Sequence, residues 1–205
     1  MNLKPNLFNH NEVDCRFPYD EADTVNLFSR KLVSYIPSSM VRPVIIICIG
    51  TDRSTGDSLG PLVGSKLHEK DTSYFHVYGT LDEPIHAVNL EEQLIKIKRR
   101  HHNPFIIAID ACLGRLNSVG IISIGDGPVK PGAGVNKQLP SVGDIHITGI
   151  VNVSGFMEFF VLQNTRLSLV MKMASAIADG ISEASKQLER KQALSRTTWE
   201  QSRIQ

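Results

Sequence analysis

Two aspartates follow the two most apolar segments of this 205-residue sequence. Asp57 lies in the polar loop 50–59, after the run Val44–Ile49, and Asp110 directly follows the run Phe105–Ile109. Continuous β-branched runs of this kind are typical of strands buried on both faces of a parallel sheet. Because ligands bind beyond the carboxyl ends of such strands, we expect Asp57 and Asp110 to face each other across a cleft. Paired carboxylates can share a proton for general acid–base catalysis, or together hold a divalent metal.

Each aspartate also has a structural explanation. Asp57 could cap the helix that follows it, and Asp110 could accept hydrogen bonds from the adjacent loop backbone. A third candidate is His146, which lies in an alternating, strand-like segment and could equally be a hydrogen-bonded strand residue. If the fold brings it to the two carboxylates, the three side chains would suit Zn²⁺, Ni²⁺ or Mn²⁺.

The loop after the first apolar run is not a nucleotide-binding loop. Gly56 is followed by Asp57 and Ser58, where a Walker loop would have Lys and Ser or Thr. A carboxylate at the position of the phosphate-binding lysine repels an anion, and the Gly-x-Gly-x-x-Gly fingerprint is absent. A nucleotide triphosphatase and a dinucleotide-dependent enzyme are therefore not favoured.

Other polar residues have weaker claims to a role in the site. Glu83 and His86 follow a short predicted strand and could line the same sheet edge. Cys112 lies two residues after Asp110, but without an evident base it is better explained as a small buried thiol. Ser54 and the other loop serines lack a nucleophile elbow, which argues against a serine hydrolase.

The periodicity of the chain predicts an α/β fold. Apolar spacing gives the order α-β-α-β-α-β-β-β-α, and this alternation indicates a mostly parallel sheet with helices on both faces. We expect one domain over residues 1–205, with a weakly ordered lead-in at 1–20 and a polar, fraying tail at 189–205. The expected helices cover 23–36, 60–69, 89–100 and 167–181, and the expected strands cover 44–50, 75–78, 105–110, 120–124 and 144–151.

Composition excludes several classes of protein. Lys and Arg number 22 and Asp and Glu 21, so the net charge of +1 argues against a nucleic-acid-binding specialist. Three widely spaced cysteines suggest neither a disulfide framework nor a cysteine zinc site. No signal peptide and no apolar run of about 18 residues is evident, so we expect a reduced, cytoplasmic protein without a membrane partner.

Three segments together resemble a known group of proteins. Gly-Asp-Ser-Leu-Gly-Pro at 56–61, Ile-Ala-Ile-Asp-Ala at 107–111 and Pro-Gly-Ala-Gly-Val-Asn-Lys at 131–137 resemble the germination protease that degrades small acid-soluble spore proteins. By its length the chain resembles most the YyaC family of sporulation proteins. Both groups are similar in fold to the hydrogenase maturation endopeptidases. The resemblance implies a three-layer α/β/α sandwich of the phosphorylase/hydrolase-like type, with the site on strand-end loops.

The resemblance also implies roles for individual residues. Asp57 and Asp110 match the catalytic aspartates of the germination protease. In the maturation endopeptidases the corresponding acidic residues bind nickel together with a later histidine, for which His146 is the best match. The chain differs in having Gly50-Thr51 where the relatives have Gly-Asn, and it is shorter than the germination protease.

The expected function is accordingly a peptidase of sporulation or germination. Its substrate would be a protein or peptide, such as the small acid-soluble spore proteins, and its location the forespore or spore core. Alternatives are a metal-dependent maturation-type endopeptidase and a non-catalytic binding or scaffold protein of the spore. The apolar helix near the C-terminus offers an interface for a homo-oligomer.

Overall fold

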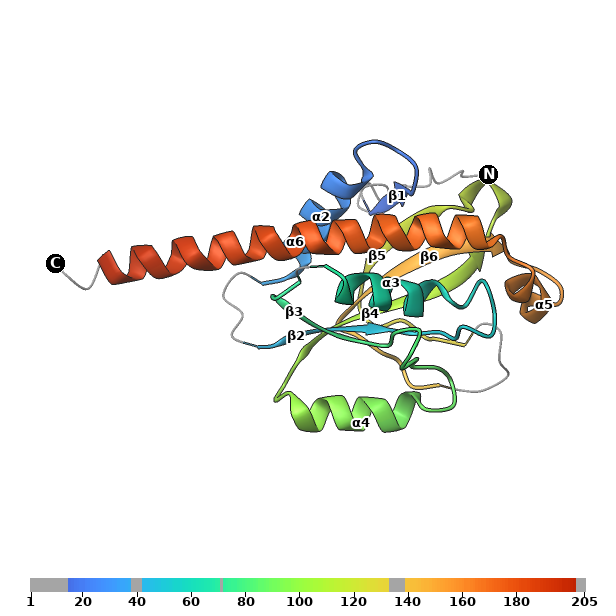
Figure 1. The fold of residues 1–205 in the computed structure, drawn as a ribbon, viewed down its shortest axis with the longest axis horizontal. Coiled ribbons are helices and arrows are strands. Elements are labelled where there is room, and N and C mark those ends of the chain that lie inside the picture. The colour runs from blue at the N-terminus through green and yellow to red at the C-terminus, as the bar shows by residue number, and fades with distance from the viewer. Residues whose placement is uncertain (1–14, 38–41, 71, 133–138, 202–205) are drawn as a thin grey trace, which may run out of the picture.

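A six-stranded sheet lies between two layers of helices (Figure 1). The computed structural model describes residues 15–37, 42–70, 72–132 and 139–201. The strand order is β1-β5-β6-β4-β2-β3, and β3, β2, β4 and β6 run parallel to one another. The strands are β1 (Arg16–Pro18), β2 (Val44–Cys48), β3 (Phe75–Tyr78), β4 (Phe105–Gly114), β5 (Ile121–Asp126) and β6 (Ile145–Val153). The helices are α2 (Thr24–Tyr35), α3 (Leu59–His68), α4 (Leu90–Arg100), α5 (Glu158–Gln163) and α6 (Leu167–Gln201), with a 3₁₀ turn at Leu116–Ser118.

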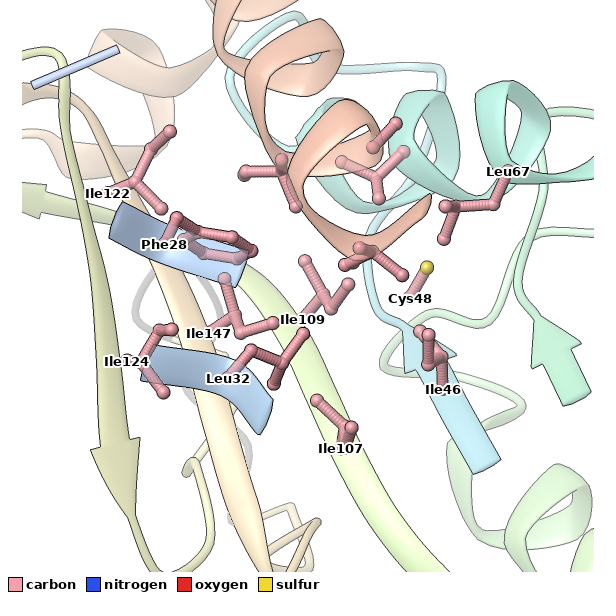
Figure 2. Packing of buried hydrophobic residues seen from close by; sticks show 14 of the residues in the cluster. Phe28, Leu32, Ile46, Cys48, Leu67, Ile107, Ile109, Ile122, Ile124 and Ile147 are labelled. Carbon is pink, nitrogen blue, oxygen red and sulfur yellow. The ribbon is translucent and has the colours of Figure 1, made fainter. Parts of the chain in front are cut away.

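β2 and the first half of β4 are apolar on both faces because helices cover both faces of the sheet. All five residues of β2 are buried, and their side chains alternate between the two sides of the sheet. Ile46 and Cys48 belong to the larger core, which α2, α3 and α6 cover, and Figure 2 shows these side chains with Leu67 of α3. Ile45 and Ile47 belong to the smaller core under α4. The three-layer α/β/α sandwich with a mostly parallel sheet is therefore confirmed.

The sheet has an antiparallel side that the sequence pattern did not predict. β5 runs antiparallel to β6, and β1 runs antiparallel to β5. Phe17 of β1 is only 6% exposed, and its ring meets that of Phe28 edge-on at a centroid distance of 5.6 Å. The expected weak order of the lead-in is thus wrong for residues 15–20, since pairing and burial hold the strand. Residues 1–14 lie outside the described residues.

The last helix continues beyond the point where fraying was expected. α6 runs from Leu167 to Gln201, and its distal half projects past the sheet (Figure 1). Just after residue 188, Glu189 accepts hydrogen bonds from Ser185 (3.0 Å) and Ser73 (2.7 Å), which anchor this part of the helix. The helix thus extends beyond the expected helical range of 167–181. Within the described ranges, no helix combines the length and apolar character needed to cross a membrane.

Candidate active site

The structure brings Asp57 and Asp110 to one cavity of about 380 Å³. β2 ends at Cys48, which pairs with Ile109, so Asp110 is the first residue of β4 beyond the end of its neighbour. Asp57 reaches the same place from the loop that follows β2. Both side chains are partly accessible, and both line the cavity. The convergence expected from two parallel strand ends is therefore present.

The loop after β2 folds back on itself, which returns Asp57 to the end of the strand. The amide of Thr51 donates to the carbonyl of Asp57 (3.1 Å) and closes the loop. Gly50 has φ of +148°, and a Cβ at this position would lie 1.9 Å from the Asp57 carbonyl oxygen. Only glycine fits such a close approach. The loop therefore requires Gly50 in order to position Asp57.

Asp57 does not act as a helix cap. The N-cap residue of α3 is Ser58, and no side-chain capping bond is made there. Burial raises the pKa of the Asp57 carboxyl, and the nearby Ser54 hydroxyl acts in the opposite direction. The capping explanation is thus not realised, and the carboxylate is left to the cavity.

Asp110 is the more strongly perturbed of the two acids. Burial raises its pKa from an ordinary value of 3.8 to about 8, and the negative charge of Asp57 adds to that rise. One opposing interaction is present, because Asp110 Oδ1 accepts a hydrogen bond from the amide of Ala111 (2.9 Å). That contact is the backbone bond expected as an alternative, but it occupies one oxygen only. Of the two acids, Asp110 has the larger shift and therefore keeps its proton to the higher pH.

The loop after β3 adds His86 to the cavity. The side chain of Asn89 fixes this loop, because its Oδ1 accepts from the His86 amide (2.8 Å) and its Nδ2 donates to the Pro84 carbonyl (2.9 Å). The His86 ring accepts a hydrogen bond at Nδ1 from the Val88 amide (3.2 Å). Glu83, expected at the same edge, is exposed and is not among the residues that line the cavity.

His146 does not join the two aspartates, and the predicted three-ligand metal site of Asp57, Asp110 and His146 is wrong in this respect. In the sheet register His146 pairs with Ala108, two residues before Asp110, so it lies at the beginning of β6. Its Nδ1 lies 2.9 Å from the carbonyl oxygen of Gly127. Among the residues that the structure describes, no three His, Cys, Asp or Glu side chains are grouped to hold a metal ion.

Sequence reasoning missed α5, which forms one wall of the cavity. Phe159 and Leu162 of this helix line it, and the amide of Gly56 donates to the Leu162 carbonyl (2.8 Å). The helix is therefore bound directly to the loop that carries Asp57. Exposed apolar residues continue outside the cavity, since Phe160 of α5 is 52% exposed and Phe156, just before the helix, is 89% exposed. The signal in the sequence was the cluster Phe156, Phe159 and Phe160, which has the i, i+3, i+4 spacing of a helix but covers too few residues to establish a period.

Cys112 lines the cavity but is not prepared as a nucleophile. Burial raises the pKa of its thiol to about 11, so the reactive thiolate is scarce at neutral pH.

Pro131 and Gly132, which begin the third motif, also line the cavity. The rest of that motif, at 133–137, lies outside the described residues.

Comparison with known proteins gives three findings. Residues 16–180 match the family model described as "Protein of unknown function (DUF1256)". The chain is 53% identical over 205 residues to the "Uncharacterized protein YyaC" of Bacillus subtilis (strain 168), covering 100% of this chain and 95% of that protein. A crystal structure of the [NiFe] hydrogenase maturation protease HycI from Thermococcus kodakarensis KOD1 is similar with a TM-score of 0.48 and 20% identity, over 76% of this chain and 99% of that one.

Proposed function

The chain belongs to the DUF1256 family, and for this member we propose a peptidase activity carried by Asp57 and Asp110. One observation supports this proposal above all: two carboxyl groups line the same cavity, and burial raises the pKa of Asp110 to about 8. Pairs of acids whose environments separate their pKa values are typical of general acid–base catalysis. The arrangement provides a base and an acid within one site.

The proposed reaction is attack of water on a peptide carbonyl. The Asp57 carboxylate accepts a proton from water while the water oxygen forms a bond to the carbonyl carbon. The Asp110 carboxyl group gives its proton to the carbonyl oxygen, which produces a neutral tetrahedral diol. When the C–N bond breaks, Asp57 returns its proton to the leaving amine, and Asp110 recovers one from the diol.

The lining of the cavity suits a polypeptide substrate. Its walls include Ile49, Ala111, Leu113 and Phe159, which are apolar groups around a small polar centre. Pockets of this composition bind the apolar parts of a ligand and orient it through a few polar groups. The exposed aromatic residues of α5 extend the apolar surface beyond the cavity, as a docking surface for a longer chain would require.

For the substrate we propose small acid-soluble spore proteins, degraded during sporulation or germination. The support is the ordered set of motifs around Asp57 and Asp110, together with the 53% identity to YyaC of a Bacillus. On this proposal the protein works in the forespore or spore core.

The test is cleavage of purified small acid-soluble spore proteins by the full chain, followed by mass spectrometry. Asp57→Asn and Asp110→Asn should each lower the rate by about 10²–10⁴-fold, the usual contribution of general acid–base groups. Asp52→Asn is the matched control, since Asp52 lies exposed on the same loop and does not line the cavity. Cleavage at the parental rate by the double variant D57N/D110N would contradict the proposal.

A further inference from the structure

Ser54 presents a buried hydroxyl group without a hydrogen-bond partner. The residue is 6% exposed, and its Oγ is the one buried side-chain N or O atom among the described residues that makes no hydrogen bond. An unsatisfied buried hydroxyl costs about 1–3 kcal/mol, so native structures rarely keep one without a reason. Ser54 lines the same cavity as Asp57 and Asp110.

The backbone holds Ser54 in this position. Its carbonyl accepts a hydrogen bond from the amide of Ser58 (3.0 Å), and the bond between Thr51 and Asp57 closes the loop around it. Ser58 itself behaves as an ordinary buried serine, since its Oγ donates to the carbonyl of Thr55 (2.7 Å). These two buried serines on one loop therefore differ: Ser58 has a hydrogen-bond partner for its hydroxyl, whereas Ser54, which lines the cavity, has none.

The hydroxyl of Ser54 also lies near the carboxylate of Asp57. It favours the ionised form of that acid, although the two groups form no direct bond of normal geometry. A small molecule with both donor and acceptor capacity would satisfy both groups. A water molecule can donate two hydrogen bonds and accept two, and the proposed reaction needs a water molecule at this place.

We propose that Ser54 is a third catalytic residue, whose hydroxyl donates a hydrogen bond to the water that attacks the peptide carbonyl. This inference rests on the proposed peptidase function. The water donates one hydrogen to the Asp57 carboxylate and accepts one from Ser54, which leaves its second lone pair to form the bond to the carbonyl carbon. Ser54 keeps its own proton throughout, and the water's proton passes to Asp57.

The experiment compares Ser54→Ala with Ser58→Ala in the full chain, using cleavage of small acid-soluble spore proteins and thermal unfolding. S54A should lower kcat by about 10²-fold, because the attacking water loses the donor that fixes its position, and a displacement of about 1 Å can cost this much. Its melting temperature should not fall, because no protein hydrogen bond is lost. S58A should show the opposite pattern, with a lower melting temperature and kcat within twofold of the parent.

The pH profile separates this role from a structural one. Loss of the Ser54 hydroxyl should move the rising limb of kcat to higher pH, because it removes a group that favours ionised Asp57. An S54A variant that cleaves at the parental rate while D57N is inactive would overturn the role of Ser54 and leave the peptidase proposal intact. A melting temperature that falls as far as in S58A would likewise assign Ser54 a structural role. A parent protein that cleaves no peptide bond would overturn both proposals.

Discussion

Replacing Asp110 by asparagine should stabilise the protein increasingly as the pH rises. Burial raises the pKa of Asp110 to about 8, whereas in the unfolded chain it returns to near its ordinary 3.8. Between these values the native state keeps a proton that the unfolded state releases, so the stability contributed by the protonated acid declines with increasing pH. Asparagine imitates the neutral acid and has no proton to lose.

The size of the effect follows from the pKa difference. The slope is about 1.4 kcal/mol per pH unit over a window of about four units, which gives an upper value of about 6 kcal/mol by pH 8. Because the side chain is partly accessible to the cavity, water entry lowers this value, and we expect a gain of about 2–6 kcal/mol. Above pH 8 both states are ionised, and the difference between the variant and the parent should level off.

Urea unfolding of the parent and of Asp110→Asn at each pH from 4 to 9 measures this difference. The two free energies of unfolding should be similar near pH 4 and diverge steadily toward pH 8. Asp52→Asn, which changes an exposed carboxylate on the neighbouring loop, should keep the parental pH dependence. Parallel curves for Asp110→Asn and the parent across the whole range would refute the conclusion that Asp110 is a buried neutral acid.

Three further substitutions test the walls of the cavity. Gly56→Ala places a Cβ 2.8 Å from a methyl group of Leu162 and 3.0 Å from its carbonyl oxygen, so Leu162 must move. We expect kcat/KM for peptide cleavage to fall by about tenfold, with a loss of about 1–3 kcal/mol in stability. Phe159→Ala should raise KM by about tenfold at nearly constant kcat, since it removes uniform binding. His146→Ala should keep kcat/KM within twofold and lose about 1 kcal/mol of stability with its ring hydrogen bond; a larger loss of activity would return His146 to the site.

The sequence pattern predicted the part of the site that depends on parallel strands. β2 and β4 are recognisable because burial on both faces requires continuous apolar runs. Once both are placed in one parallel sheet, their carboxyl ends must lie at the same edge. The position of Asp110 follows from that constraint, whereas Asp57 reaches the same edge because the loop after β2 folds back on itself.

Residues positioned by register could not be predicted in the same way. His146 lies on a strand adjacent to β4, but its distance from Asp110 depends on which residues pair. The register sets His146 opposite Ala108, and no property of the segment 144–148 alone could reveal this. Whether a strand histidine reaches a strand-end site is therefore decided by tertiary structure.

Short elements held by tertiary contacts were missed for a related reason. β1 has three residues, and α5 has six, preceded by Met157 in the left-handed region with φ of +59°. Segments this short carry no reliable period. The burial of Ser54 belongs to the same class, because it depends on the closure of the loop after β2.

The pH dependence of kcat/KM for cleavage of a small acid-soluble spore protein tests the paired-aspartate mechanism most directly, because this constant reports the ionisation of the free enzyme. We predict a bell-shaped profile, which rises as Asp57 ionises and falls near pH 8 as Asp110 loses its proton. A rate that continues to rise through pH 9 would contradict the assignment of Asp110 as the acid.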